Sequence, residues 1–243
     1  MPIPILMYHQ IAEAPARGNP FRGLCVSPRR FRRHMIWMRR LGYRGLSMRH
    51  LMPYLRGEQA GKVFGITFDD GYRNVYDHAL PVLNELGFTA TTYCVANQVN
   101  GSNIWDMDKG IAFSPLMNAS EMLRWTQQGH EIGSHTLDHV RLSNCTLDES
   151  RRQIEGSKNV LEELLGTPVT AFCYPYGDQT PLHRQMVRLA GYENATLVQR
   201  GRASTGDNLF ALPRVTVSRT TGPLRLLQKC FTDYEASRAA AGH

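Results

Sequence analysis

Two adjacent carboxylates stand at the end of a strand-like run in the 243-residue sequence. The apolar residues of 66–68 lead directly into Asp69 and Asp70, and Gly71 then allows a sharp turn. Because neighbouring carboxylates repel each other, either a metal ion relieves the repulsion or one carboxyl has a raised pKa and acts as a base. The alternative is that the dipeptide only caps a helix.

A pair of histidines follows a second apolar run. His135 and His139 are four residues apart, and on a helical turn this spacing places both imidazoles on one face, where they can bind one ion. Two histidines and a carboxylate with one open position form a recurrent catalytic zinc site. Because such a pair also occurs by chance on surfaces, the prediction of a metal site depends on the aspartates elsewhere in the chain.

A third polar segment ends the run at 171–174. Pro175 and Gly177 predict a rigid turn that could direct backbone N–H groups into a site, although alone it is typical of an ordinary turn.

Alternating elements must position these three segments. Four amphipathic stretches predict helices at 27–41, 120–128, 148–165 and 181–189. Short apolar runs predict strands at 3–8, 63–68, 89–95, 131–134, 170–174, 195–198 and 212–217. This alternation indicates a parallel sheet or barrel, in which polar residues gather where the strands end.

The three segments together resemble the polysaccharide deacetylases of the NodB-homology type, carbohydrate esterase family four. The resemblance rests on Thr67-Phe68-Asp69-Asp70-Gly71, on the His135–His139 pair and on Tyr174-Pro175-Tyr176-Gly177, in the family's order. It implies an α/β fold, a distorted (β/α) barrel of about seven parallel strands, over a single catalytic domain at 1–243.

The resemblance also implies roles for individual residues. Asp69 would be the catalytic base, and Asp70, His135 and His139 would bind a divalent metal, most plausibly Zn²⁺. The backbone N–H of Tyr176 would hold the oxyanion formed when an N-acetyl group is hydrolysed.

Two residues typical of the family are missing. Cys173 stands where members carry an arginine that orients the base, and the late histidine that serves as general acid is absent. His9, at the end of the first strand, is a candidate acid, with a histidine bonded only to backbone as the alternative. Arg214 is a candidate for the missing arginine.

Three residues are candidates for contact with the substrate: Pro175, Trp105 and Arg214. Trp105 falls in the irregular stretch 97–117, where it could stack on a sugar ring, or it could belong to an ordinary acidic surface loop.

Basic charge is concentrated in one part of the chain. Residues 1–56 hold eleven arginines and one acid, whereas the remainder is close to neutral, so nucleic-acid binding along the whole chain is not expected. The predicted helix 27–41 carries six arginines and no acid. This face could contact an anionic membrane or a lipid-linked glycan, or it could simply be solvated.

The termini and cysteines give an expectation of location. The N-terminal segment lacks the basic and apolar regions of a signal peptide, so either the protein stays in the cytoplasm, at the inner face of the membrane, or a leader has been removed. Five widely spaced cysteines favour reduced thiols.

Three functions remain open at this point. The first is a metal-dependent hydrolase that removes N-acetyl groups from an N-acetylhexosamine-containing saccharide or lipid-linked glycan. The second is a hydrolase of a small non-sugar amide. The third is a glycan-binding module without turnover, which the missing arginine and histidine would suggest.

Overall fold

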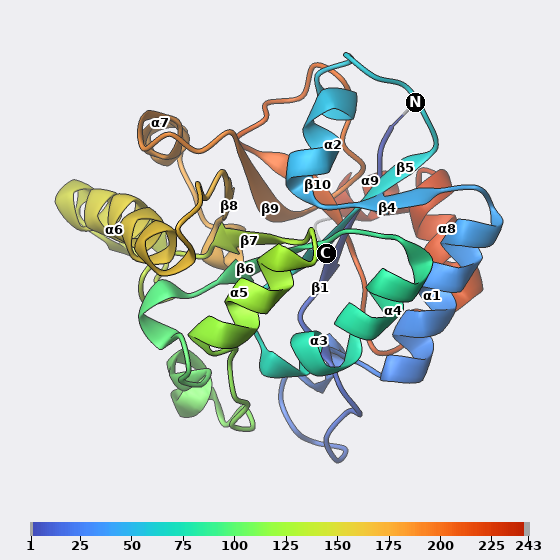
Figure 1. The fold of residues 1–243 in the computed structure, drawn as a ribbon, viewed down its shortest axis with the longest axis horizontal. Coiled ribbons are helices and arrows are strands. Elements are labelled where there is room, and N and C mark those ends of the chain that lie inside the picture. Colours follow the sequence, from blue (N-terminus) through green and yellow to red (C-terminus); the bar gives the residue numbers. More distant parts are fainter. Residues whose placement is uncertain (1, 241–243) are drawn as a thin grey trace.

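A ring of seven parallel strands forms the centre of the structure, a computed structural model that describes residues 2–240 (Figure 1). The strands are β1 (Ile5–Tyr8), β5 (Val63–Phe68), β6 (Thr91–Cys94), β7 (Glu131–Ser134), β8 (Ala171–Cys173), β9 (Asn194–Arg200) and β10 (Leu212–Thr216). Their order around the ring is β1-β10-β9-β8-β7-β6-β5, and β5 pairs with β1 to close it. Each of the seven predicted runs overlaps one of these strands, so the predicted (β/α) barrel is confirmed.

Three further strands were not predicted. β4 (Arg44–Leu46) pairs with the first half of β5, outside the closed ring. β2 (Gln10–Ile11) and β3 (Cys25–Val26) form a small parallel sheet just beyond the end of β1. Each has only two or three residues, which is too few to show an alternating pattern.

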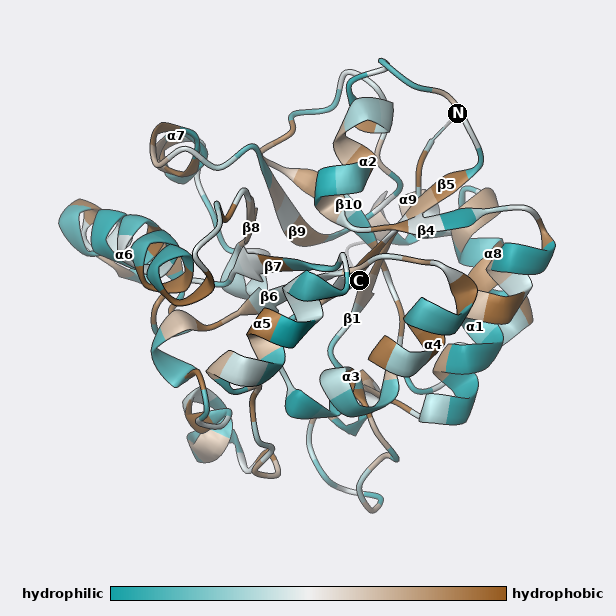
Figure 2. Ribbon diagram, in the orientation of Figure 1, coloured by the Kyte–Doolittle hydropathy of each residue, from teal (hydrophilic) through white to brown (hydrophobic). Residues whose placement is uncertain are grey.

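Helices surround the barrel and turn their hydrophilic faces outward (Figure 2). The predicted helices correspond to α1 (Pro28–Arg40), α5 (Ala119–Gln127), α6 (Leu147–Leu165) and α7 (Pro181–Leu189). The others are α2 (Met48–Leu55), α3 (Arg73–His78), α4 (Leu80–Leu86), α8 (Pro223–Phe231) and α9 (Tyr234–Ala240). Within residues 2–240, no helix combines the length and the apolar character needed to span a bilayer.

Helix α2 closes the end of the barrel at which the strands begin. The N–H of Met48 donates to Thr91 Oγ1 (2.7 Å), and the N–H of Arg49 donates to Glu131 Oε2 (2.9 Å). Thr91 and Glu131 are the first residues of β6 and β7. The remaining open end, or mouth, is therefore the end at which the strands finish.

The barrel interior is filled below the mouth. Ile5, Tyr93 and Leu212 pack inward against α2, while alternate residues of the same strands pack outward under the other helices. Gly133 shows how tight this interior is, because a Cβ atom there would lie 2.5 Å from the ring of Tyr93. Within residues 2–240, the barrel interior is therefore packed with side chains below the mouth.

Helix α1 has an acidic partner that the sequence did not reveal. Glu85 of α4 binds both Nη atoms of Arg32, and its backbone carbonyl accepts from Arg39 (3.4 Å). Two of the six arginines on this face are therefore bonded to a neighbouring helix, although the helix itself carries no acid. Contact with an anionic membrane stays a prediction that depends on the other four.

His34 of α1 is buried in its neutral form. Its Nε2 atom donates to the carbonyl of Thr221 (2.8 Å), which leaves Nδ1 to accept from the Tyr8 hydroxyl (3.0 Å). Burial lowers the pKa of His34 from 6.5 to about 4. Between these two values the unfolded chain binds more protons than the folded one, so stability falls as the pH falls from about 6.5 towards 4.

We predict that His34→Gln weakens this pH dependence. At about 1.4 kcal/mol per pKa unit, the neutral histidine accounts for a few kcal/mol of the difference in unfolding free energy between neutral and acidic solution. Urea unfolding at pH 7.5 and pH 5 measures that difference. The exposed His50→Gln is the matched control and should behave as the wild type. An unchanged pH dependence in His34→Gln would show that another group is responsible.

Candidate active site

Polar side chains from five strands meet at the barrel mouth. Most of them line a cavity of about 330 Å³, and Arg214 lies behind it. Asp69 and Asp70 follow β5, His9 follows β1, His135 and His139 follow β7, Tyr176 follows β8, and Arg214 lies within β10. The cavity is lined by Met7, His9, Phe21, Leu24, Asp69, Asp70, Trp105, Asp106, Lys109, His135, His139, Arg141, Tyr176 and Val198.

Arg214 binds Asp69 through two parallel hydrogen bonds. Nη1 donates to Asp69 Oδ1 (2.6 Å) and Nη2 to Asp69 Oδ2 (2.7 Å). The other donors bind the carbonyl of Leu197 (2.7 Å), Thr67 Oγ1 (3.0 Å) and Cys173 Sγ (3.3 Å). A guanidinium has five N–H groups, so every one is used although the side chain is fully buried.

This pair determines the charge state of Asp69. Burial acts to raise the pKa of its carboxyl group, but the charge and hydrogen bonds of Arg214 more than offset this and hold the pKa below its ordinary value. Asp69 is therefore ionised, with both oxygen atoms fixed in direction.

Two predicted substrate contacts lie elsewhere. Arg214 is 0% exposed and does not line the cavity. It lies behind Asp69 and orients its carboxylate. Pro175 is also buried, within the single turn η5 (Pro175–Gly177), and it shapes the turn that presents Tyr176. Both side chains are covered by other protein groups, and their direct contact with a substrate stays a prediction.

Asp70, His135 and His139 form a compact buried cluster beside this pair. Asp70 Oδ1 lies 3.5 Å from His135 Nε2 and 3.3 Å from His139 Nε2. One ligand atom from each residue lies within 4.8 Å of the others. Burial acts to raise the pKa of Asp70, and hydrogen bonds from the two imidazoles bring it well below the usual value.

The far nitrogen of each imidazole is also bonded. His135 Nδ1 donates to the carbonyl of Cys173 (2.7 Å), and His139 Nδ1 lies 3.2 Å from the hydroxyl oxygen of Tyr176. Such bonds fix the rings and direct both Nε2 atoms toward Asp70, where a bound ion could take the place of their protons. The donor set, two imidazoles and a carboxylate, fits a divalent ion of the zinc type.

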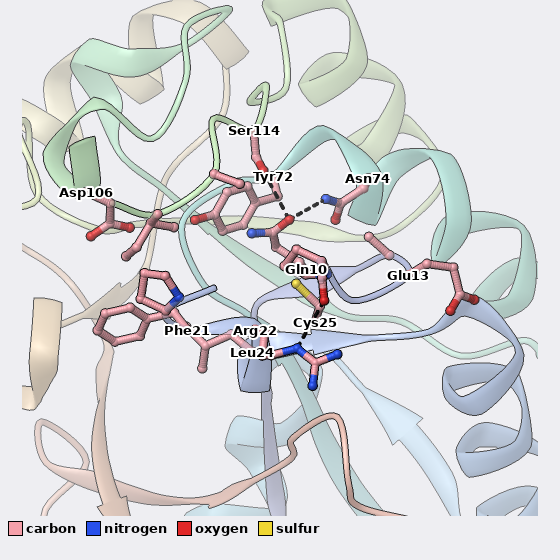
Figure 3. A pocket seen from close by; sticks show the side chains of 15 residues that line it. Gln10, Glu13, Phe21, Arg22, Leu24, Cys25, Tyr72, Asn74, Asp106 and Ser114 are labelled. Atoms are coloured by element: carbon pink, nitrogen blue, oxygen red, sulfur yellow. Dashed lines mark hydrogen bonds between the residues drawn. The ribbon is translucent and has the colours of Figure 1, made fainter. Parts of the chain in front are cut away.

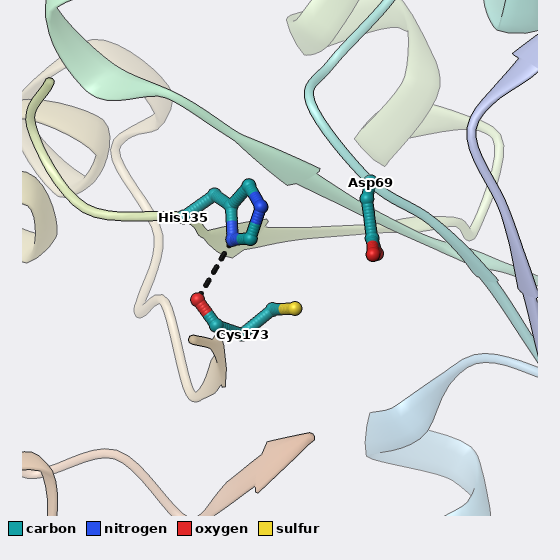
Figure 4. Close-up of side chains that lie close together, drawn as sticks. All are labelled: Asp69, His135 and Cys173. Atoms are coloured by element: carbon teal, nitrogen blue, oxygen red, sulfur yellow. Dashed lines mark hydrogen bonds between the residues drawn. The ribbon is translucent and has the colours of Figure 1, made fainter. Parts of the chain in front are cut away.

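A second possible ligand set consists of Asp69, His135 and Cys173 (Figure 4). Asp69 already receives two hydrogen bonds from Arg214, and the Cys173 sulfur receives a third. A cation placed among these atoms would sit beside a buried guanidinium, and the repulsion disfavours it. Among residues 2–240 no arginine or lysine pairs with Asp70, so the set containing Asp70 is the better metal site.

The histidines are not on a helical turn, contrary to expectation. Residues 135–139 form an irregular loop in which Thr136 and His139 have positive φ angles of 67° and 58°. Gln153 of α6 supports the loop, because its side-chain oxygen accepts from the N–H groups of Leu137 and Asp138 (both 3.0 Å). The imidazoles therefore meet through loop geometry and not through helical periodicity.

Unusual backbone conformations concentrate at this mouth. Asp70 (φ 74°) and Tyr176 (φ 61°), like His139, occupy the left-handed region. For residues with a side chain this region costs about 1–2 kcal/mol each, so the surrounding packing must hold them there. Tyr176 comes early in its turn, where a backbone N–H has no helical partner and can face a ligand.

His9 and Trp105 lie at the wall of the cavity. His9 Nε2 is 3.9 Å from Asp69 Oδ2, which brings this predicted residue to the site. Trp105 lies in the short 3₁₀-helix η3 (Ile104–Lys109) and stacks on His139, with ring centroids 4.6 Å apart and an interplanar angle of 22°. One face of the indole is thus covered, and only the other face remains for a sugar ring.

Sequence reasoning missed the cationic groups around Tyr176. Lys109 Nζ bonds both the Tyr176 hydroxyl (3.0 Å) and Asp106 (2.9 Å), and the Arg141 guanidinium lies 4.0 Å from the centre of the tyrosine ring. Lys109 comes from the irregular stretch 97–117 and Arg141 from the loop after His139. No spacing in the sequence connects them to Tyr176.

We predict that Arg214→Met lowers the free energy of unfolding by about 3–5 kcal/mol, because it leaves the Asp69 charge buried without a partner. Adding Asp69→Ala to this variant should restore part of the loss. Arg32→Met is the matched control: it also breaks a two-pronged pair with a glutamate, but at the surface, where it should cost less than about 1 kcal/mol. Equal losses in urea unfolding for the two arginines would contradict the assignment.

Comparisons with known proteins agree with this geometry. The family model described as polysaccharide deacetylase matches residues 56–195. YxkH of Bacillus subtilis, whose name places it in the same family, is 30% identical over 218 residues, covering 89% of this chain and 71% of that protein. The poly-beta-1,6-N-acetyl-D-glucosamine N-deacetylase of Staphylococcus epidermidis is 22% identical over 79% of this chain and 68% of its own length.

The fold has a similarly close counterpart among solved structures. The Streptococcus pyogenes deacetylase PplD, in complex with acetate, superposes with a TM-score of 0.82 and 26% identity, over 95% of this chain and 98% of that one. The matched region of the family model holds β5 to β8 and the loops that carry Asp69, Asp70, His135, His139 and Tyr176. The chain therefore belongs to the polysaccharide deacetylase family.

Proposed function

We propose that this chain is a metal-dependent N-deacetylase that hydrolyses the N-acetyl group of an N-acetylhexosamine residue in a saccharide or lipid-linked glycan. One observation carries the proposal: Asp69, held ionised by Arg214, lies directly beside the Asp70–His135–His139 cluster on the floor of an open cavity. A base next to a metal site is the arrangement that hydrolysis of an amide by water requires.

Asp70, His135 and His139 would hold the metal, for which Zn²⁺ fits the donor types. When bound, the ion would polarise the acetyl carbonyl and lower the pKa of the attacking water. The protein contributes the rigid placement of the three donors, through the Cys173 carbonyl and the Tyr176 hydroxyl that bind the far nitrogen atoms.

Asp69 accepts the proton of the attacking water in this proposal. A carboxylate can do so only while it is ionised and correctly directed, and Arg214 provides both conditions. As negative charge develops on the acetyl oxygen, the backbone N–H of Tyr176 donates to it. His9, at the wall of the cavity and 3.9 Å from Asp69, is placed to protonate the departing amine.

The named relatives support a sugar amide as the substrate. The Staphylococcus epidermidis protein acts, by its name, on an N-acetylglucosamine polymer, and the solved Streptococcus pyogenes deacetylase holds acetate, which is the acid that N-deacetylation releases. The missing arginine was one of the two reasons to consider a binding module without turnover. Arg214 supplies from β10 the guanidinium that is absent at Cys173, so this reason no longer applies.

We predict that Asp69→Asn lowers acetate release from N-acetylglucosamine oligomers at least about 100-fold, because it removes the base. Its metal content, measured by plasma mass spectrometry, should stay at the wild-type level, because Asp69 is outside the ligand set. Asp148→Asn, at an exposed site on α6, is the control and should keep full activity. A chelator should abolish activity in the wild type.

Three other outcomes would contradict the proposal. Full activity in Asp69→Asn would exclude it as the base. Release of acetate from small non-sugar amides alone would favour the second function considered above. Binding of the oligomers by the wild-type, metal-loaded protein without any release would favour a glycan-binding module.

A further inference from the structure

A cavity at the closed end of the barrel, opposite the mouth, has no part in the proposed chemistry. Its volume is about 400 Å³, and it lies where β4 and α2, which are side by side in Figure 1, meet the end of α4. Its polar lining includes Arg44, Arg49, His50, Tyr54 and Gln59, and we call it the basal cavity. Because α2 and the packed barrel interior lie between, a ligand bound there has no contact with the catalytic cavity.

Positive side chains line the basal cavity, and among residues 2–240 no acid lines it. Arg44, Arg49 and His50 are its charged or titratable residues. The two cavities at the mouth instead carry both signs of charge: the catalytic cavity contains three aspartates beside its cations, and the cavity next to it combines Glu13 with Arg22 (Figure 3). A cavity lined by one sign of charge attracts a ligand of the opposite sign, so the basal cavity is suited to an anion.

The acids near the basal cavity do not cancel its charge. Glu85 of α4 is bonded to Arg32 of α1. Glu131 is 1% exposed and accepts from the Thr91 hydroxyl (2.6 Å). Burial raises the pKa of the Glu131 carboxyl group, so it opposes the positive charge less than an exposed glutamate would. Glu58 is exposed and lies outside the cavity lining, and among residues 2–240 neither arginine of the cavity forms an ion pair.

Hydrogen bonds fix several donors of the basal cavity. Arg44 Nη2 donates to the hydroxyl oxygen of Tyr54 (2.5 Å), which leaves four of its five N–H groups without an acceptor among residues 2–240. Tyr54 is only 8% exposed, and because its oxygen accepts from Arg44, its own O–H can donate to another group. His50 Nδ1 lies 3.1 Å from both Ser47 Oγ and Thr89 Oγ1, so Nε2 is left for another partner. A nearly buried hydroxyl donor beside an unpaired guanidinium is matched by an acceptor ligand.

The arrangement of these donors fits a phosphate group. A guanidinium presents parallel N–H groups that match two oxygen atoms of a phosphate. Donors reach the cavity from separate elements: Arg44 from β4, Arg49 and Tyr54 from α2, and Gln59 from the loop after α2. A tetrahedral phosphate can accept from several directions at once, whereas a planar carboxylate offers only two oxygen atoms.

We propose that the basal cavity is a second ligand site, which binds a phosphate group, either free in solution or carried by a phospholipid headgroup. This site goes beyond the proposed function, because the phosphate takes no part in the hydrolysis at the mouth. If the phosphate belongs to a lipid, the protein lies on the membrane with its mouth directed away from the lipid surface.

The first test is titration of inorganic phosphate into isotope-labelled, metal-loaded protein, followed by NMR. The backbone N–H signals of Gln59 and Thr89 report on the basal cavity and not on phosphate at the mouth. In the wild type these signals should shift and saturate. Arg44→Gln combined with Arg49→Gln should raise the Kd at least about tenfold, because two charged donors are lost. Tyr54→Phe keeps the charge and the ring, and it should raise the Kd about threefold through loss of the hydroxyl alone.

Arg33→Gln combined with Arg40→Gln is the matched control. It removes the same charge from two exposed residues of α1 that lie outside the basal cavity, and it should leave the Kd unchanged. An equal rise of the Kd in both double variants would show attraction to net charge alone and would overturn the site. Signals of Gln59 and Thr89 that do not shift in the wild type would also overturn it.

Co-sedimentation with phosphatidylglycerol vesicles identifies the source of the phosphate. If the wild type and the α1 double variant sediment with the vesicles and the cavity double variant does not, the ligand is a lipid headgroup. If inorganic phosphate binds and the vesicles do not retain the wild type, the ligand is a phosphate in solution. Both results support the site, whereas a wild type that binds neither probe overturns it.

Acetate release separates this site from the proposed function. The cavity double variant should release acetate from soluble N-acetylglucosamine oligomers at the wild-type rate, because the basal cavity lies at the far end of the barrel from the mouth. A loss of activity in this variant would contradict the independence of the two sites. The phosphate titration needs no turnover, so the basal cavity can be confirmed even if no saccharide yields acetate and the proposed chemistry fails.

Discussion

Two carboxylates that are adjacent in the chain are both buried at the barrel mouth, and the rest of the site depends on how each is neutralised. Asp69 is hydrogen-bonded to the fully buried guanidinium of Arg214, whereas Asp70 lies against the imidazoles of His135 and His139. Without such partners the two adjacent charges would repel each other in a medium of low dielectric, and at least one carboxyl would become protonated. In the proposed function, this separation of partners leaves Asp69 for proton transfer and Asp70 for metal coordination.

The barrel provides the rigidity that this separation needs. Arg214 reaches Asp69 from a strand that is 145 residues away in sequence but two places away around the ring, with β1 between them. The backbone at Asp70 and Tyr176 is in a conformation that an isolated loop would leave. Packing in the barrel interior and between the strands and helices outweighs the free-energy cost of these left-handed backbone conformations. The functional loops can therefore be strained while the strands that carry them are regular.

Much of this arrangement could be predicted from the sequence because it is local. The apolar runs indicated the seven ring strands, and the polar residues directly after them indicated which end of the barrel carries the site.

The loop at 135–139 was assigned the wrong conformation because a spacing of four suits a helix, while the actual loop depends on Gln153, a residue of the following helix. The role of Arg214 was only one option among several, since the sequence does not show that β10 is close enough to β5.

We propose that Arg214 keeps Asp69 and Cys173 out of the metal site, so that the ion binds to Asp70, His135 and His139. X-ray absorption spectroscopy at the zinc edge of the zinc-loaded protein tests it most directly. We expect the spectrum to show only nitrogen and oxygen ligands, at zinc–ligand distances of about 2.0–2.2 Å, together with the outer-shell scattering of two imidazoles. A sulfur ligand at about 2.3 Å would place the ion with Cys173, Asp69 and His135 and would contradict the account.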